Sequence, residues 1–189
     1  MPELYIIAGA NGAGKSTISR SLVQQVDIPI IDPDAIARSL DPIDPLRVAV
    51  QAGKAAIDRA HKYIETATSF GVETTLSGRN YLKLMKSLKQ KGWSINLIYI
   101  GIDNPETNIR RVRERVSRGG HDVPINDIRR RYERSLNNLS IAITLTDSVT
   151  IYDNSERGFS LIATIENGNI STHVAEYPSW YDRIINGLQ

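Results

Sequence analysis

The residues with the clearest chemical potential lie near the start of the chain, where Gly9-Ala10-Asn11-Gly12-Ala13-Gly14-Lys15-Ser16 fits the pattern G-x-x-x-x-G-K-[ST]. Glycines at this spacing let consecutive backbone N–H groups converge on phosphate oxygens, and a helix that begins at the loop adds its dipole. The lysine of such a loop reaches the β- and γ-phosphates, and the serine hydroxyl binds Mg²⁺. We therefore expect ATP and Mg²⁺ as cofactors, held by Gly9, Asn11, Gly12, Ala13, Gly14, Lys15, Ser16 and Thr17.

Carboxylates suited to phosphoryl transfer lie at two later strand-like runs. After the first run, Asp34 can take the proton of an acceptor hydroxyl and Asp32 can hold a magnesium-bound water. A strand-ending turn with a helix N-cap is the structural alternative for this pair. Within the second run, Glu73 and Thr75 are candidate ligands of the acceptor hydroxyl, because a buried carboxylate needs a partner. An edge strand with outward polar groups is the alternative there.

Arginines are concentrated between residues 110 and 134, which hold nine of them and a net charge of +5, whereas the remainder of the chain has −3. Arginines that close over a phosphoryl group stabilise the charge of its transition state. We therefore expect two helices joined by Gly119-Gly120 to form a lid, with Arg129, Arg130, Arg131 and Arg134 off the apolar face of the second helix. His121 in that lid is either a phosphate donor or a turn residue. RNA binding is the competing interpretation, and the acidic remainder of the chain disfavours it.

Apolar patterning predicts an α/β fold of the P-loop NTPase type, with a mostly parallel sheet flanked by helices. The expected strands lie at 4–8, 28–31, 72–76, 95–102 and 149–152, and the expected helices at 16–26, 46–69, 81–90, 106–118 and 126–145. Asn167-Gly168 predicts the turn of a C-terminal hairpin over 160–175, with a last helix after it. In such sheets ligands bind beyond the carboxyl ends of the strands, where the polar motifs above lie.

Two helices carry apolar stripes that predict their buried faces. On the first the stripe is Val50, Gly53, Ile57, Ala60, Ile64 and Ala67, and on the second it is Ile125, Ile128, Tyr132, Leu136, Leu139 and Ile143. The second stripe would pack against the body and leave the arginines free to face the phosphates.

Length and composition fit one domain over residues 1–189, with a lid at about 106–145 and a hairpin and helix at about 156–189. That last part carries no recognisable chemistry, and Trp180 and Tyr181 are expected as core or rim aromatics. No apolar run approaches the roughly 20 residues of a membrane span, and no signal peptide is visible. The absence of cysteine excludes a disulfide scaffold, a thiolate zinc site and a cysteine nucleophile, and fits a cytoplasmic protein.

In combination, these motifs resemble the zeta toxin family, the P-loop kinases that phosphorylate the sugar of UDP-N-acetylglucosamine. The resemblance runs from about residue 3 to 155. Its carriers are Gly9–Thr17, Asp32–Ala37, Glu73–Gly78, Arg111–Val116, Gly119–Pro124 with Arg129–Tyr132, and Tyr152–Ser155.

The resemblance implies that Asp34 is the catalytic base, that Glu73 and Thr75 bind the sugar, and that Arg115 is the first lid arginine. His121 holds the place of the family's second lid arginine, so Arg118 and Arg130 are the candidates for that role. The resemblance also implies a substrate-binding arginine directly after Glu73–Leu76. Here Ser77-Gly78 intervenes, so Arg79, the candidate for this role, is shifted from the family position.

The resemblance thus implies an ATP- and Mg²⁺-dependent kinase acting on a hydroxyl of a nucleotide sugar, with a small antitoxin protein as a further partner. A kinase of a different metabolite, and a non-catalytic nucleotide-dependent protein that binds RNA or another protein, are the alternatives.

Overall fold

The computed structural model describes residues 1–120, 122–156 and 158–185. Its elements in chain order are β1 (Glu3–Ala8), α1 (Lys15–Val26), β2 (Ile30–Ile31), α2 (Pro33–Leu40), α3 (Ala49–Glu65), β3 (Phe70–Thr74), α4 (Asn80–Gln90), β4 (Ser94–Gly101), α5 (Pro105–Val116), α6 (Ile125–Leu145), β5 (Ser148–Asp153), β6 (Ser160–Glu166), β7 (Asn169–Thr172) and α7 (Ser179–Ile185). None of these helices is long and apolar enough to cross a membrane.

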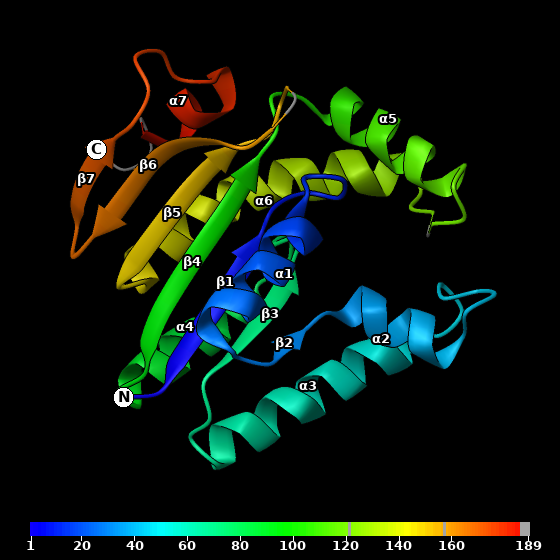
Figure 1. Ribbon diagram of the computed structural model, residues 1–189, viewed down its shortest axis with the longest axis horizontal. Helices are drawn as coiled ribbons and strands as arrows, with labels where there is room; N and C mark the ends of the chain where they lie inside the picture. The colour runs from blue at the N-terminus through cyan, green and yellow to red at the C-terminus, as the bar shows by residue number, and fades with distance from the viewer. Residues whose placement is uncertain (121, 157, 186–189) are drawn as a thin grey trace.

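The described strands form one sheet in the order β2-β3-β1-β4-β5-β6-β7. The pairs from β2 to β5 are parallel, and β6 and β7 are added antiparallel as a hairpin. Parallel pairing brings the carboxyl ends of β3, β1, β4 and β5 to one edge, near the loop that leads into α1 (Figure 1). The predicted α/β class with a mostly parallel sheet is confirmed.

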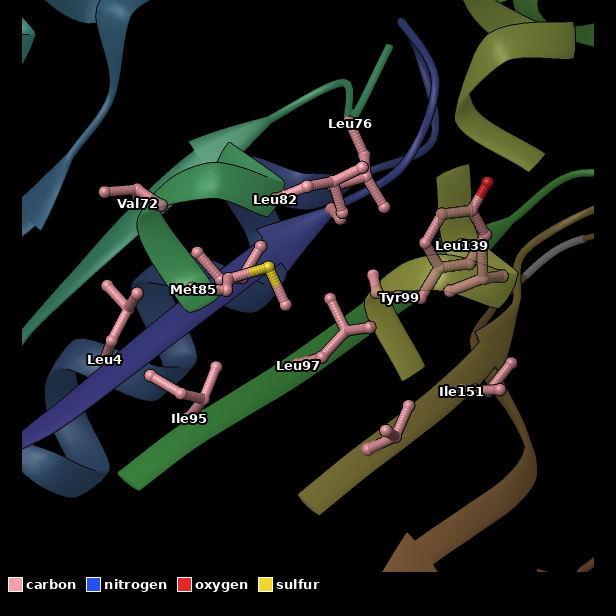
Figure 2. Packing of buried hydrophobic residues seen from close by; sticks show 14 of the residues in the cluster. Leu4, Val72, Leu76, Leu82, Met85, Ile95, Leu97, Tyr99, Leu139 and Ile151 are labelled. Carbon is pink, nitrogen blue, oxygen red and sulfur yellow. The ribbon is translucent and has the colours of Figure 1, made fainter. Parts of the chain in front are cut away.

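Helices cover both faces of the sheet and divide the core into two main parts. On one face, side chains from β1 and β4 meet Leu82 and Met85 of α4 and Leu139 of α6 (Figure 2). On the other face, Ile7 and Ile100 pack with Ala13 and with side chains of α1. Apolar residues of β1 and β4 are buried on both sides, as parallel strands between two helical layers require.

The helix predicted at about 46–69 is α3, which is shorter at both ends, and the prediction of its buried face is wrong in part. It buries Ala52, Ala56 and Ala60, of which only Ala60 belongs to the predicted stripe, and the separate helix α2 was not among the expected helices. Val50 and Ile57 are 76% and 51% exposed. The small alanine side chains let α3 lie close to α2 and β2, so tertiary packing selected the face with the smallest residues, not the most apolar ones.

Strand β3 ends at Thr74, two residues before the predicted end. The Thr74 hydroxyl accepts a hydrogen bond from the Leu76 N–H, and Leu76 has a left-handed backbone with φ of 55°. That geometry turns the chain out of the sheet. Because β3 lies between β2 and β1, the edge-strand alternative for Glu73 is wrong.

The C-terminal helix α7 packs against α6 and the end of the sheet. Trp180 and Tyr181 are 1% and 2% exposed, so both are core residues. The Trp180 indole occupies the space that a Cβ atom at Gly101 would need, and its Nε1 donates to Asp153 Oδ1 at 2.7 Å. This contact holds the end of β5 at Asp153. The next residue, Asn154, contacts the phosphate-binding loop.

Candidate active site

The loop between β1 and α1 is shaped by glycines that no other residue could replace without strain. Gly9 has φ of 149°, and a Cβ atom there would collide with the Ile100 carbonyl. Gly14 has φ of 98°, and its Cβ would lie 2.8 Å from Asn154 Nδ2. The loop closes with turns such as Ala13 N to Ala10 O at 3.1 Å, and α1 then starts at Lys15. The predicted strand–loop–helix context of the phosphate-binding motif is confirmed.

Two asparagines outside the motif hold this loop from α5 and from the end of β5. Asn108, fully buried on α5, donates through Nδ2 to the Asn11 carbonyl, and Asn154 Nδ2 donates to the Ala13 carbonyl at 2.9 Å. Asn108 is not among the residues predicted from the sequence, and Asn154 appears there only within the family motif Tyr152–Ser155. Each asparagine binds a backbone carbonyl of a segment that is distant in the chain, and only the fold brings the two together. The local sequence pattern therefore did not identify these asparagines as part of the site.

Lys15 lies among carboxylates at the start of α1. Its Nζ donates to the Gly9 and Ala10 carbonyls at 2.9 and 3.2 Å. Burial lowers the pKa of Lys15, while the charges of Glu73, Asp34 and Asp32 act in the opposite direction. A lysine positioned in this way can bind an anion such as a phosphate oxygen.

Glu73 connects the second motif to the first. The carboxylate is 7% exposed, and its Oε2 accepts a hydrogen bond from the Ser16 hydroxyl at 3.0 Å. Burial and the neighbouring Asp32 raise the pKa of Glu73, whereas hydrogen bonds from Ser19 and Ser16 and the charge of Lys15 lower it in part. The side chain therefore has the partner that its burial requires, and that partner is the serine of the phosphate-binding loop.

Asp32 and Asp34 lie at the N-terminus of α2. Asp32 is the N-cap residue, since its Oδ1 accepts from the Asp34 N–H at 2.9 Å, and its Oδ2 is 3.5 Å from Arg38. The N-cap alternative is thus confirmed for Asp32, although the same residue also faces the site. Asp34 is exposed in the first turn of the helix, where its carboxylate is accessible to an incoming molecule.

A cavity of about 270 Å³ brings the motifs together. The predicted site residues that line it are Asn11, Lys15, Asp32, Asp34, Glu73 and Thr75. The lining residues that were not predicted as site residues are Pro33, Thr74, Ser77, Tyr81 and Arg131. The cavity therefore places two cations, three carboxylates and four hydroxyl side chains around one small volume at the carboxyl ends of β1 and β3.

Arg131 is the arginine of α6 that reaches this cavity. It is 36% exposed and lies 3.9 Å from Asp127, whereas Arg130 is 55% exposed and pairs with the same carboxylate at 2.8 Å. Arg131 directly precedes the buried Tyr132 and lies four residues before the buried Ser135. That position at the border of the apolar stripe is the signal that could have distinguished it from its neighbours.

Two further predicted site residues lie away from the cavity lining. The lid candidate Arg118 is exposed in the turn after α5, and the acceptor-binding candidate Arg79 is exposed at the start of α4. Arg115 lies near enough to Lys15 that its charge helps to lower the pKa of Lys15. The Arg115 carbonyl accepts a hydrogen bond from the Gly120 N–H. His121 lies outside the described residues.

The donor set fits Mg²⁺ of the kind that is held largely by phosphates and water. Within the described part of the chain, no three His, Asp or Glu side chains form a metal-binding group. Mg²⁺ in nucleotide sites commonly uses only one or two protein ligands. Ser16, the oxygens of Glu73 and Asp32 beside it, and the buried Asn11 side-chain oxygen, which has no hydrogen-bond partner among described residues, provide suitable chemistry.

Comparison with known proteins gives a family match over most of the chain. A sequence model described as Zeta toxin matches residues 1–162. A protein of Haemophilus influenzae, described as an uncharacterized protein, is 39% identical over 124 residues, which is 66% of this chain and 88% of that protein.

Solved structures agree on the fold. The AvrRxo1-ORF1:AvrRxo1-ORF2 structure with sulphate ions aligns with a TM-score of 0.76 and 18% identity over 97% of this chain and 63% of that chain. A structure from the PezAT chromosomal toxin-antitoxin system of Streptococcus pneumoniae aligns with a TM-score of 0.66 and 18% identity over 99% of this chain and 84% of that chain. The present chain thus spans less than two thirds of the AvrRxo1 chain that it matches.

Proposed function

This chain belongs to the zeta toxin family, and we propose that it transfers the γ-phosphoryl group of ATP to a hydroxyl of a small molecule. It is a phosphotransferase with a P-loop kinase fold. UDP-N-acetylglucosamine is the first acceptor to test, because the motifs resemble those of kinases that act on it. One observation carries the proposal: Lys15, Asp34, Glu73 and Arg131 line the same cavity at the carboxyl ends of the strands.

The proposed reaction assigns proton transfer to Asp34. Its carboxylate accepts the hydroxyl proton as the acceptor oxygen forms a bond to the γ-phosphorus. The bond from that phosphorus to the bridging oxygen of the β-phosphate breaks, ADP leaves, and Asp34 releases its proton to water. The exposure of Asp34 and its place at the cavity are compatible with both proton transfers.

Cationic side chains have the complementary role of stabilising charge on the phosphoryl oxygens. We assign this role to Lys15 from the loop, to Arg131 from α6 and to Arg115 from α5. Arg118 and Arg130 remain predictions for the same role. When bound, Mg²⁺ would neutralise charge on the β- and γ-phosphates, with Ser16 as a ligand and Asp32 holding a water of its shell.

Glu73 and Thr75 would bind and orient the acceptor. The Thr75 hydroxyl is 2.8 Å from the Ser77 hydroxyl, so the turn after β3 presents two hydroxyl groups to the cavity. Glu73 accepts a hydrogen bond from Ser16 and lines the cavity, so its carboxylate can contact the acceptor next to the phosphate-binding loop. Arg79 and His121 are kept as acceptor-binding proposals from the sequence.

The wider assignment has three further parts. We propose that residues 1–189 act as one kinase domain with a lid at about 106–145, and that the reaction takes place in the cytoplasm. A small antitoxin-like protein is also proposed as a partner, because the AvrRxo1-ORF1 structures are of a complex with ORF2 and the PezAT structure is of a toxin-antitoxin system.

The proposal is tested by Asp34→Asn, with Asp58→Asn on the exposed side of α3 as the matched control. Each protein is incubated with labelled ATP and Mg²⁺, with UDP-N-acetylglucosamine in one series and a small-molecule cell extract in another, and products are identified by mass spectrometry. Loss of a positioned general base lowers the rate by roughly 10²- to 10⁴-fold, so Asp34→Asn is expected to lose product while ATP binding by calorimetry is retained.

Two results would contradict the proposal in different ways. Wild-type turnover in Asp34→Asn would remove Asp34 as the base. ATP binding with no phosphorylated product from either series, together with salt-dependent RNA binding, would instead favour the non-catalytic alternative.

A further inference from the structure

A second cavity, of about 500 Å³, lies between α3 and α4. Apolar side chains make up most of its wall, among them Ala56, Ile57 and Ala60 of α3 and Leu84 of α4, with Val72 of β3 contributing as well. No carboxylate is among its described lining residues. The cavity has the size and apolar lining of a small-molecule site.

This cavity adjoins the reaction site. Pro33 and Tyr81 line both the 500 Å³ cavity and the 270 Å³ cavity that contains Lys15 and Asp34. Pro33 directly precedes Asp34, so a molecule whose hydroxyl meets Asp34 can extend past Pro33 and Tyr81 into the apolar space. Tyr81 can pack its ring against a flat or aliphatic group on this path.

The helical pattern of α3 supports a role beyond packing. Gly53, Ile57 and Ala60 belong to an apolar stripe, yet Ile57 is 51% exposed and Gly53 is only half-buried. All three line this cavity, although Ala60 is itself a buried residue at the edge of the core. A Cβ atom at Gly53 would meet no heavy atom within 4 Å, so the glycine leaves open volume at the wall.

We infer that the acceptor alcohol carries an aromatic or heteroaromatic ring or an alkyl chain beside its hydroxyl-bearing part, and that this group lies in the α3–α4 cavity. The inference rests on the proposed kinase function and narrows its acceptor. A strongly charged group would lose its hydration against Ala56, Ala60 and Leu84, whereas an apolar group gains by leaving water. His61, Asn80 and Lys83 line the same cavity and are exposed, so they can meet a polar end of the acceptor.

The test fills the cavity with a side chain from its own wall. Gly53→Leu adds a leucine into open space in the interior of a helix, where leucine is favoured over glycine, so folding is expected to be retained. Gly53→Ala is the small-volume control, and Gln51→Leu places the same leucine on the exposed surface of α3. Thermal unfolding and ATP binding by calorimetry are measured for all three variants.

The functional readout is the yield of each phosphorylated product that wild type makes from labelled ATP and a small-molecule cell extract. We expect the main product to contain an aromatic or heteroaromatic ring or an alkyl chain, and the kcat/KM for its formation to fall by about 10- to 100-fold in Gly53→Leu, which corresponds to the free energy of burying one apolar group. Gly53→Ala and Gln51→Leu are expected to stay within about threefold of wild type.

Each other outcome has a distinct meaning. A product that lacks both an aromatic or heteroaromatic ring and an alkyl chain, or an unchanged kcat/KM in Gly53→Leu, overturns the inference and leaves the kinase proposal standing. A wild-type protein that binds ATP but yields no phosphorylated product overturns the kinase proposal, and the inference falls with it.

Discussion

Replacing Arg131 by alanine tests the central electrostatic assignment of the site. Arg131 lines the cavity with Lys15 and Asp34, and its described ion pair, with Asp127, has a separation of 3.9 Å. An exposed pair of this length contributes little to stability, at most about 0.5 kcal/mol. We therefore expect Arg131→Ala to unfold at nearly the wild-type temperature and to change the rate of phosphoryl transfer instead.

The size of the rate effect follows from what the guanidinium would bind. One hydrogen bond between charged groups contributes about 1.5–3 kcal/mol, and each 1.36 kcal/mol corresponds to a tenfold change in rate. The expected loss in kcat is therefore roughly 10- to 150-fold. The value lies below the 10³-fold of a fully enclosed arginine finger, because the side chain is still 36% exposed and water screens its charge.

The neighbouring Arg130, the candidate named from the sequence, gives a direct comparison on the same helix. It pairs with Asp127 at 2.8 Å and is not among the cavity-lining residues, so the geometry of the cavity predicts that Arg130→Ala retains at least a third of the wild-type kcat, whereas the sequence-based candidate role predicts a larger loss. The assay follows the initial rate of product formation with saturating ATP, for whichever acceptor the extract experiment identifies. ATP affinity and thermal unfolding are measured in parallel, so that a loss of binding or of folding is recognised.

Two results would refute this reasoning. If Arg131→Ala keeps the wild-type kcat, Arg131 does not stabilise the transferring phosphoryl group. If Arg130→Ala loses as much rate as Arg131→Ala, the cavity lining does not identify the functional arginine, and the prediction made for Arg130 from the sequence is the better one. Arg131→Lys adds a further measurement, because lysine keeps the charge but loses the forked geometry.

Two further substitutions test the site's electrostatics and its support. Burial raises the pKa of Glu73 above its unfolded value of about 4.3, so ionisation of this side chain destabilises the folded protein as the pH rises. The Glu73→Gln variant should therefore have a higher melting temperature than wild type at pH 7, and this difference should shrink toward pH 4. Its rate of phosphoryl transfer should fall. A lower melting temperature at pH 7 would contradict this. Gly101→Ala should lower the free energy of unfolding by about 1–3 kcal/mol in denaturant unfolding, because the new Cβ atom meets the Trp180 indole. Gly78→Ala is the control, since its Cβ atom would lie in open space, and it should change the free energy of unfolding by less than about 0.5 kcal/mol. Equal effects of the two substitutions would show that the Trp180 side chain moves without cost.

Local sequence was sufficient wherever a short segment contains its own physical constraint. The phosphate-binding loop is one example, because positive φ angles at Gly9 and Gly14 and the following helix are encoded within a few residues. The hairpin turn at Asn167-Gly168 is another, since both residues adopt the left-handed geometry that the turn needs. The parallel arrangement of the strands also followed from the alternation of apolar runs and helices.

Sequence was insufficient where several faces or neighbours satisfy the same local pattern. Four arginines of α6 lie off its apolar stripe, and the sequence does not distinguish Arg131 from Arg130. The difference arises because Arg131 lies at the border of the face that packs on the sheet, and is thereby carried to the cavity. The same holds for α3, where close packing buried the alanines and left Ile57 on a cavity wall.

By itself, then, the sequence determined the α/β class, the phosphate-binding loop and the set of carboxylates that could do chemistry, because each depends on residue types and short spacings. Only the tertiary structure decided that Glu73 binds Ser16, that Asp32 faces the same cavity as Glu73 and Lys15, and that an apolar cavity adjoins Asp34 through Pro33 and Tyr81. These are contacts between segments tens of residues apart, and their geometry is fixed by how the strands order in the sheet and how closely the helices pack on it.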